Sequence, residues 1–299
     1  MPTTTTAPSP PAAKSSPVGT GERLALAAAT LCLIGAGVPP AAPETSKVPV
    51  MLMTGLPIVW GEAGPFDPGS RPAAAYVELQ RDFSFRPVDV LDEASLARGK
   101  LLFLAQPHRL GPAELADLDA WIRGGGRALI LTDPILNWPS ELALGDIRRP
   151  PPTGLLAPRL GHWRLALDPP AAPGEVAARW NERPLAMDSP GAFRSSNPDC
   201  IVAPEGWTAL CRLGRGRVRL VADADLMRDP LWAPDGGGRR AADNPAIVGE
   251  WLDELAETPR HRPRLPEAGA GWVGGGLIAL ALLAAATGIG LLLRRRRGR

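Results

Sequence analysis

The sequence is poor in the residues that usually build a metal centre or a disulfide framework. It has 299 residues with three cysteines and three histidines, and its formal net charge is +2. Three cysteines are too few for a disulfide scaffold, and no histidine has a cysteine or a second histidine at ligand spacing. Five arginines stand among the last six residues. Because the rest of the chain has no basic excess, we expect no nucleic-acid partner. Because no cluster of metal-ligating residues is visible, we expect no metal, and we also expect no cofactor.

Sequence motifs of common catalytic sites are also missing. No G-x-S-x-G sequence follows a predicted strand, and no G-x-x-x-x-G-K-[ST] phosphate-binding loop occurs, so the chain is not an ATPase. The triple glycine at residues 124–126 ends a predicted helix, whereas a phosphate-binding loop opens one. We therefore expect a protein without enzymatic activity. A hydrolase whose nucleophile the sequence does not reveal is the alternative.

An uncharged apolar run occupies residues 268–293 and is followed by the arginine-rich tail 294–299. About 26 residues at 1.5 Å each give a helix of roughly 39 Å, enough to cross a hydrocarbon core of ~30 Å. Arginines beside a membrane span stay on the cytoplasmic side, so the tail is expected in the cytoplasm and the preceding domain outside. Gly271 and Gly275, four residues apart, would let two such helices pair closely.

A shorter apolar run occupies residues 23–43, after a tail at 1–22 that is rich in threonine, proline, serine and alanine. Such a tail is expected to be disordered, because it cannot bury enough apolar surface. Pro39, Pro40 and Pro43 crowd the positions of a cleavage site, so we favour an uncleaved signal anchor over a cleaved signal peptide. Both apolar segments predict a protein of the bacterial inner membrane with a periplasmic main domain.

Residues 47–256 form that extracytoplasmic domain, and a proline-rich linker at 257–267 leads to the C-terminal span. In its first half, short apolar runs typical of buried strands alternate with helical patterns. The predicted strands are residues 48–54, 86–91, 101–105 and 127–132, and the predicted helices between them are residues 72–83, 93–98 and 112–124. Alternation of this kind indicates right-handed crossovers and a parallel sheet.

The second half of the domain has shorter and more irregular elements. Short strands are predicted at residues 163–167, 175–180 and 183–187, as an antiparallel excursion. Two further strands at 207–213 and 218–222, joined by Gly214-Arg215-Gly216, are typical of a hairpin, and an amphipathic helix is predicted at 244–256. The expected fold class is α/β, with a mostly parallel sheet flanked by helices and a transmembrane helix at each end.

Candidate site residues follow the carboxyl ends of the predicted strands, where open parallel sheets bind ligands. These residues are aromatic or ionisable: Trp60, Glu62, His108, Asp133, Asp223 and Asp225. One interpretation is a polar pocket with an aromatic wall for a sugar-like or peptide-like ligand, or a weak cation site of carboxylates. The other is that Asp133 and Asp225 cap backbone N–H groups at turns.

Cys200 and Cys211 flank the turn-rich stretch 202–207 and could face each other across a hairpin. Outside the cytoplasm their oxidation to a disulfide is permitted. The alternative is a pair of buried free thiols.

Two segments carry a resemblance to a known family. Residues 101–107 and 110–134, with a helix, a glycine run, a strand and Asp133-Pro134, resemble the extracytoplasmic domain of gliding-motility-type (GldG-like) ABC transporter auxiliary proteins. The later stretch 216–226, followed by Asp243-Asn244-Pro245-Ala246, is similar to a related signature. The resemblance implies a glutamine-amidotransferase-like, flavodoxin-related fold without its enzyme, because Leu104-Ala105-Gln106-Pro107 occupies the turn where such enzymes place a nucleophilic cysteine.

The resemblance also implies a function. It points to a non-catalytic accessory subunit of an ABC-type transport system, with the ATPase and the permease on separate chains. A periplasmic module that senses a sugar or peptide, using the candidate site residues, is the competing hypothesis.

Overall fold

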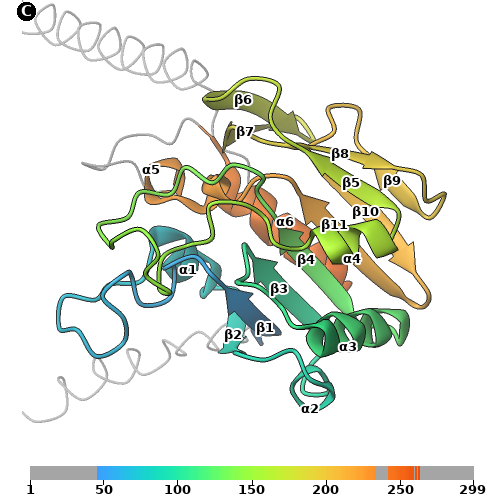
Figure 1. Cartoon of the computed structure of the whole chain (residues 1–299), viewed down its shortest axis with the longest axis horizontal. Coiled ribbons are helices and arrows are strands. Elements are labelled where there is room, and N and C mark those ends of the chain that lie inside the picture. Colours follow the sequence, from blue (N-terminus) through green and yellow to red (C-terminus); the bar gives the residue numbers. More distant parts are fainter. Residues whose placement is uncertain (1–45, 233–241, 259, 261, 263–299) are drawn as a thin grey trace, which may run out of the picture. The chain divides into compact units, whose positions relative to one another are not determined.

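The computed structural model describes residues 46–232, 242–258, 260 and 262 (Figure 1). Along the chain the elements are β1 (Val48–Thr54), α1 (Ala74–Leu79), β2 (Phe83–Pro87), α2 (Glu93–Leu96), β3 (Leu101–Ala105), α3 (Pro112–Arg123), β4 (Arg127–Leu131), α4 (Ala157–His162), β5 (Leu165–Asp168), β6 (Glu175–Trp180), β7 (Arg183–Asp188), β8 (Ala192–Ser195), β9 (Cys200–Val202), β10 (Thr208–Leu213), β11 (Gly216–Val221), the 3-10 helix η1 (Asp225–Met227), α5 (Asp229–Trp232) and α6 (Asn244–Ala256).

The main sheet has seven strands in the order β2-β1-β3-β4-β11-β10-β9. The first five strands in this order pair in parallel, and β10 and β9 are antiparallel to their neighbours. The predicted α/β fold with a mostly parallel sheet is therefore confirmed. Because parallel strands share a direction, the amino ends of β2, β1, β3, β4 and β11 lie at one edge of the sheet and their carboxyl ends at the other.

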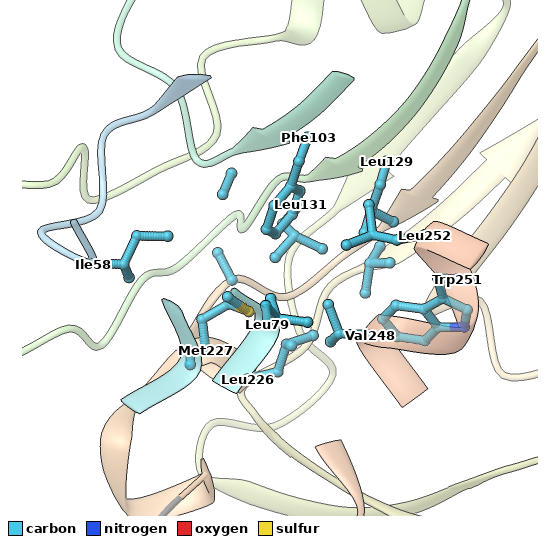
Figure 2. Close-up of a cluster of buried hydrophobic side chains, with 14 of the residues drawn as sticks. Ile58, Leu79, Phe103, Leu129, Leu131, Leu226, Met227, Val248, Trp251 and Leu252 are labelled. Carbon is cyan, nitrogen blue, oxygen red and sulfur yellow. The ribbon is translucent and has the colours of Figure 1, made fainter. Parts of the chain in front are cut away.

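Alternate residues of the central strands pack against helices on opposite faces of the sheet. On one face, Leu52, Phe103 and Leu131 contact the buried faces of α1, α5 and α6, in the cluster of Figure 2. On the other face, Leu104 and Ile130 pack against α2, α3 and α4. A strand buried on both faces needs apolar residues at every position, which explains the unbroken apolar runs of β3 and β4.

The antiparallel excursion forms two small ladders, β5 with β8 and β6 with β7. The predicted strands at 175–180 and 183–187 correspond to β6 and β7, which pair over their length. Trp180 of β6 meets Trp251 of α6 edge to face, with ring centroids 5.5 Å apart. The guanidinium of Arg219, from β11, lies over the ring of Trp180, 4.8 Å from its centroid. The β6–β7 ladder is thus packed onto the same face as α6, whereas Leu165 of β5 and Phe193 of β8 lie in the cluster of the opposite face.

The prediction was wrong at the first crossover. The helix is shorter than residues 72–83, and the strand that follows is β2, which begins at Phe83 instead of residue 86. Phe83 is 1 % exposed, and Phe85 lies 5.5 Å from Tyr76 and 6.4 Å from Phe103 between ring centroids. Burial of these aromatic rings places the strand three residues earlier, and β2 ends at Pro87.

The predicted hairpin is confirmed as β10 and β11, joined at Gly214-Arg215-Gly216. A Cβ atom at residue 216 would lie 2.0 Å from the carbonyl oxygen of Ile122 and 2.3 Å from that of Gly126. The turn is therefore pressed against the C-terminal end of α3, and only glycine fits there.

Both predicted membrane segments, at 23–43 and 268–293, lie outside the described residues. Within the part of the chain that the structure describes, no helix is both long and apolar enough to cross a membrane.

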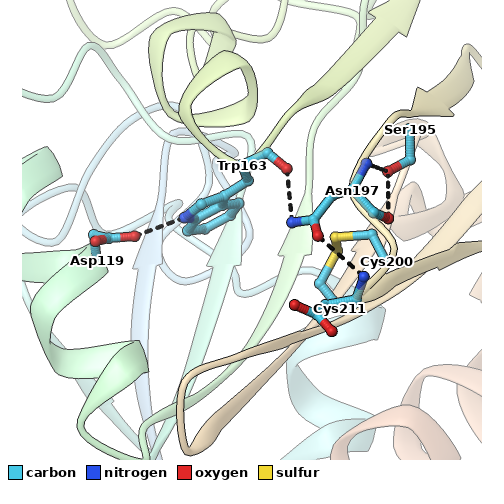
Figure 3. Close-up of a disulfide and its surroundings, with 7 residues drawn as sticks. Asp119, Trp163, Ser195, Asn197, Cys200 and Cys211 are labelled. Carbon is cyan, nitrogen blue, oxygen red and sulfur yellow. Dashed lines mark hydrogen bonds between the residues drawn. A yellow bond between two sulfur atoms is a disulfide. The ribbon is translucent and has the colours of Figure 1, made fainter.

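Cys200 and Cys211 are joined in a disulfide with an S–S distance of 2.02 Å, between directly opposed residues of β9 and β10 (Figure 3). Both side chains are buried in the cluster that contains Trp163. Trp163 donates its indole N–H to Asp119 of α3 at 2.7 Å, and its carbonyl accepts a hydrogen bond from the Asn197 amide at 3.0 Å. The disulfide thus joins the two outer strands, β9 and β10, next to the hydrogen bond that links Trp163 to α3.

Replacing both cysteines by serine should lower the free energy of unfolding by about 2–4 kcal/mol, because the cross-link restricts the unfolded chain. The measurement is a denaturant melt of the oxidised protein, the reduced protein and the double variant. Reduction should also change the mobility of the denatured chain on a gel. Equal melts and equal mobilities with and without reductant would show that the purified protein carries two free thiols.

Candidate functional site

The loops after β1, β3, β4 and β11 lie at the carboxyl edge of the sheet and carry all six candidate residues. The structure divides these residues into two groups. Trp60, Glu62 and His108 line a pocket beside β1 and β2. The three aspartates line neither this pocket nor the one beside it, and they are buried between loops further along the edge. The single rim expected from the sequence is thus two separate arrangements.

The pocket has a volume of about 310 Å³ and lies over the carboxyl end of β1. Trp60 is 52 % exposed and provides the aromatic wall. Gly55 at the pocket lies against the loop that follows β3. A Cβ atom at residue 55 would be only 2.4 Å from the carbonyl oxygen of Gln106, so no larger residue fits there. Arg148, from the long segment between β4 and α4, also lines the pocket, and its role could not be read from the sequence pattern.

Four ionisable side chains line the pocket: Glu62, Asp89, His108 and Arg148. The Oε2 atom of Glu62 accepts a hydrogen bond from the backbone N–H of Glu141 at 2.9 Å, which joins the β1–α1 loop to the β4–α4 segment. The buried Oε1 atom of Glu62 has no hydrogen-bond partner among the described residues. Arg148 pairs with Asp146 at 2.7 Å. Partial burial lowers the pKa of His108, which favours the neutral imidazole. The pocket therefore offers an aromatic wall and a neutral imidazole, and the unpartnered Oε1 atom of Glu62 is buried in its wall.

A second pocket, of about 470 Å³, adjoins the first and shares Asp89 and His108 with it. It lies at the N-terminal end of α3. The side chain of Glu114 accepts hydrogen bonds from the N–H groups of Gly111 at 2.7 Å and Leu91 at 3.2 Å. Glu114 thus occupies this helix end, and the exposed side chains of Asp89, His108 and Arg109 also line the second pocket.

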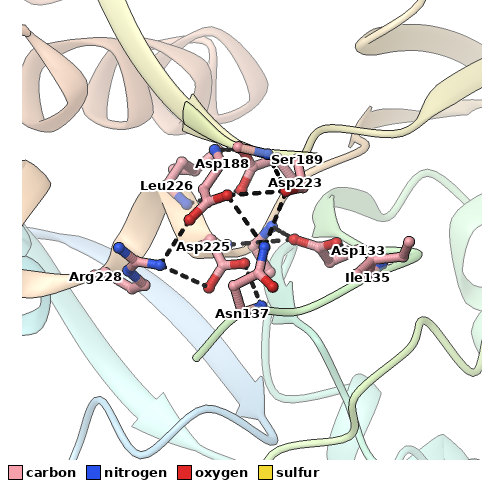
Figure 4. A network of polar contacts seen from close by, with 11 residues as sticks. Asp133, Ile135, Asn137, Asp188, Ser189, Asp223, Asp225, Leu226 and Arg228 are labelled. Atoms are coloured by element: carbon pink, nitrogen blue, oxygen red, sulfur yellow. Dashed lines mark hydrogen bonds and ion pairs between the residues drawn. The ribbon is translucent and has the colours of Figure 1, made fainter. Parts of the chain in front are cut away.

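The aspartates form a buried carboxylate cluster, defined here as Asp133, Asp188, Asp223 and Asp225 (Figure 4). Asp133 accepts hydrogen bonds from the N–H groups of Ile135 and Ala224, both at 2.9 Å. Asp223 accepts from the N–H groups of Leu226 and Asp188, both at 2.8 Å.

Asp225 accepts a hydrogen bond from the backbone N–H of Asn137 at 2.6 Å. Arg228 pairs with Asp188 at 2.8 Å and lies 3.9 Å from Asp225. Every carboxylate of the cluster thus stabilises backbone or a cation of another loop. Asp133 accepts a backbone N–H of its own turn, from Ile135, as the capping interpretation predicts, whereas the N–H that Asp225 accepts belongs to the distant Asn137.

Burial dominates the acid–base behaviour of this cluster. It raises the pKa of Asp133 to about 7, against the opposing effect of hydrogen bonds from Ala224 and Ile135. Burial raises the pKa of Asp225 to about 6, opposed by the Asn137 N–H and by Arg228. Burial and the neighbouring charge of Asp133 raise the pKa of Asp223 well above its ordinary value. No group of three or more metal-ligating side chains is found among the described residues.

Gln106 is a site residue that the sequence did not reveal. It follows β3, takes a φ of 42°, and is fully buried. Its amide nitrogen donates to the carbonyl oxygens of Asp133 at 3.2 Å and Pro151 at 3.0 Å, and its amide oxygen accepts from the N–H of Asp133 at 2.8 Å. Left-handed φ values are uncommon outside glycine, and here the conformation turns the side chain towards the loop after β4. Gln106 links the two pocket-forming loops to the aspartate cluster.

No protein family model and no curated protein sequence matches the chain. Solved structures resemble it at low identity. The N-terminal domain of mmIFT52 is 11% identical, with a TM-score of 0.45, over 73% of this chain and 100% of that one. A ThuA-like protein from Bacteroides uniformis is 10% identical, with a TM-score of 0.40, over 71% and 93%.

An exo-β-1,4-mannosidase from Opitutaceae bacterium strain TAV5 is 12% identical to the chain, with a TM-score of 0.38, over 60% of this chain. The chain spans 32% of the length of that enzyme. At these identities and TM-scores the similarities establish neither a family nor an activity.

The buried aspartates predict an unusual dependence of stability on pH. With pKa values raised in the folded state, Asp133 and Asp225 bind more protons when folded than when unfolded between about pH 4 and pH 7. Their contribution to the free energy of unfolding is therefore greatest in acid and falls as the pH rises, by up to about 1.4 kcal/mol per pH unit for each group. Asp225→Asn, which keeps an acceptor for the N–H of Asn137, should flatten this fall between pH 4 and 6 in denaturant melts.

Asp146→Asn is the matched control, because its pairing with Arg148 lowers the pKa of Asp146 to about 2, outside this window. The control should keep the pH slope of the parent chain. Equal slopes for Asp225→Asn and the parent would show that Asp225 is ionised throughout.

Proposed function

We propose that the chain is a non-catalytic, membrane-anchored accessory subunit of an ABC-type transport system. Its extracytoplasmic α/β domain, of glutamine-amidotransferase-like and flavodoxin-related type, would bind a partner protein outside the membrane. The ATPase and the permease are separate chains in this proposal, and the segments 23–43 and 268–293 are the membrane anchors.

The observation that carries the proposal is that both ends of the described domain meet at one residue, Asp82. The N–H of Val48, at the start of β1, donates to the carbonyl oxygen of Asp82 at 3.1 Å. Arg260, in the proline-rich linker, donates to the same oxygen at 3.0 Å. Arg262 pairs with the Asp82 carboxylate at 2.7 Å and with Asp253 of α6 at 2.7 Å. The chain therefore enters and leaves the domain at one place, as a domain held by both ends to one membrane requires.

The turn after β3 supports a role without catalysis. Enzymes of the resembled fold place their nucleophile at such a turn, and here the position holds Gln106. Its amide is committed to three hydrogen bonds with Asp133 and Pro151 and is fully buried. A side chain held in this way supports the loops and presents no nucleophile to a substrate.

Exposed apolar side chains on the carboxyl-edge loops support a partner-binding role. Phe66 is 98 % exposed, and Leu144 and Ile147 are 89 % and 88 % exposed. Their two segments are tied together by the hydrogen bond between Glu62 and Glu141. Large apolar side chains on linked loops, at the edge opposite the chain ends, form a suitable contact surface for another protein.

Purification of the full chain in mild detergent should recover an ABC-type ATPase and a multi-span permease with it. The triple variant Phe66→Asp/Leu144→Asp/Ile147→Asp should lose most of that recovery, because each change removes apolar contact area and adds a charge. Ile201→Asp, at a 73 % exposed position on β9, is the matched control and should keep the partners. Recovery of neither protein by the parent chain would contradict the proposal.

A second candidate function is the sensing of a small polar ligand by the pocket at Trp60. The unpartnered Oε1 atom of Glu62, beside an exposed indole ring, favours it, since sugars and peptides bind through such a combination. Here the aspartate cluster would only support the loops.

Thermal melts with a panel of mono- and disaccharides and dipeptides test this candidate. A compound that binds the pocket should raise the melting temperature of the parent chain. Trp60→Ala should abolish the rise, whereas Phe66→Ala, which also removes an exposed aromatic ring but lies outside the pocket, should keep it. A panel without any stabilising compound would count against sensing, and equal effects of both substitutions would place the binding elsewhere.

A further inference from the structure

The edge of the main sheet at which the parallel strands begin is rich in basic side chains. In register, Val48 pairs with Phe83, and Arg127 pairs with both Leu101 and Arg217, so the residues just before these positions lie along one edge. The basic edge is defined here as the lysines and arginines at these strand starts and at the end of β10: Lys47, Arg81, Arg98, Lys100, Arg127, Arg212, Arg215 and Arg217.

Most positive charges of the basic edge form no ion pair with a described residue, although Asp92 lies near enough to Arg98 for the two charges to attract each other. Lys47, Arg81, Arg98, Lys100 and Arg212 are exposed and form no ion pair with any described residue. The exception is Arg127, which pairs with Glu257 at 2.7 Å.

The acids nearby are mostly engaged elsewhere. The carboxylate of Asp82 pairs with Arg262, and Glu254 at the end of α6 pairs with the buried Arg219 at 2.6 Å. Asp199, whose carbonyl accepts the N–H of Arg212, is an exposed acid beside that arginine. A local excess of positive charge therefore exists on a domain, residues 47–256, whose formal net charge is −4.

Both chain ends of the domain leave from this edge. The predicted anchor that ends at residue 43 lies three residues before Ser46, and the predicted span that begins at residue 268 lies six residues after Arg262. Extended chain covers at most ~3.6 Å per residue, so these connections reach only about 11 Å and about 22 Å. If both segments cross a membrane, these short linkers hold the Asp82 end of the basic edge within about 20 Å of the lipid headgroups.

We propose that the basic edge docks on the anionic headgroups of the membrane in which the chain is anchored. The inference rests on the membrane anchoring in the proposed function and adds the surface and its ligand chemistry. Phosphate groups of an anionic bilayer provide counter-charge at this edge, and short tethers raise their effective concentration. The docked domain turns its carboxyl edge, with Trp60 and Phe66, away from the bilayer.

The chain contains a built-in probe of this surface. Its three lysines are Lys14, Lys47 and Lys100, so both lysines of the domain belong to the basic edge. The full chain is reconstituted in nanodiscs of phosphatidylcholine alone, or of phosphatidylcholine with phosphatidylglycerol, and treated with an amine-acetylating reagent. Mass spectrometry then gives the acetylation rate of each lysine, with Lys14 as the internal reference.

Docking should slow the acetylation of Lys47 and Lys100 by at least about fivefold in the anionic discs relative to the neutral ones, at low salt. High salt should remove the difference, because it screens exposed charges. The variant Arg98→Glu/Arg212→Glu should lose the protection. Arg71→Glu/Arg86→Glu, which reverses two exposed charges away from this edge, should keep it.

Equal acetylation rates in both kinds of disc would overturn the docking and leave the accessory role intact. A chain that the discs do not retain would overturn both. Protection by added duplex DNA, without protection by the anionic bilayer, would show that the edge binds a different class of polyanion and would likewise overturn the proposal.

Discussion

Parallel pairing of β1, β3, β4 and β11 is the constraint on which the arrangement of this domain depends. Because these strands run in the same direction, the loops that follow them all meet at one edge and the residues that precede them meet at the other. The two edges have different chemistry. One carries a pocket, exposed apolar side chains and a buried carboxylate cluster, and the other carries unpaired lysines and arginines together with both chain ends. The functional proposals follow from this separation.

The carboxylate cluster shows how the domain holds its loops together. The segments after β4, β7 and β11 carry backbone N–H groups that would lack partners in the interior, and Asp133, Asp223 and Asp225 accept them. Burying these carboxylates is costly, as the raised pKa values of all three indicate. Gln106 adds a neutral link to the same loops, so polar contacts fix the floor of the carboxyl edge together with the apolar packing of Leu226 and Met227.

The sequence predicted the fold class and most of the strands, because buried parallel strands are unbroken apolar runs. It failed where packing between distant residues decides. The start of β2 depends on the ring of Phe83 reaching the core, and β8 is recognisable only through its pairing with β5. The sequence identified the candidate aspartates but did not show that they lie apart from the pocket at Trp60. A strand pattern predicts the edge of the sheet at which a residue lies, and does not predict the residues that it contacts there. The positions of Gln106 and Arg148 could not be predicted for the same reason, because both depend on contacts with residues of other loops.

The contact of the proline-rich linker with β2 has a mechanical consequence. Arg260 and Arg262 lie over the ring of Phe83, at 5.4 Å and 5.6 Å from its centroid, while they bind Asp82 and Asp253. A pull on the linker would therefore load β2 and the start of β1 together, and would not peel α6 from its end turn by turn. Force arriving along the linker would be shared among these contacts, so tension would act on both ends of the domain together before it unravelled either of them.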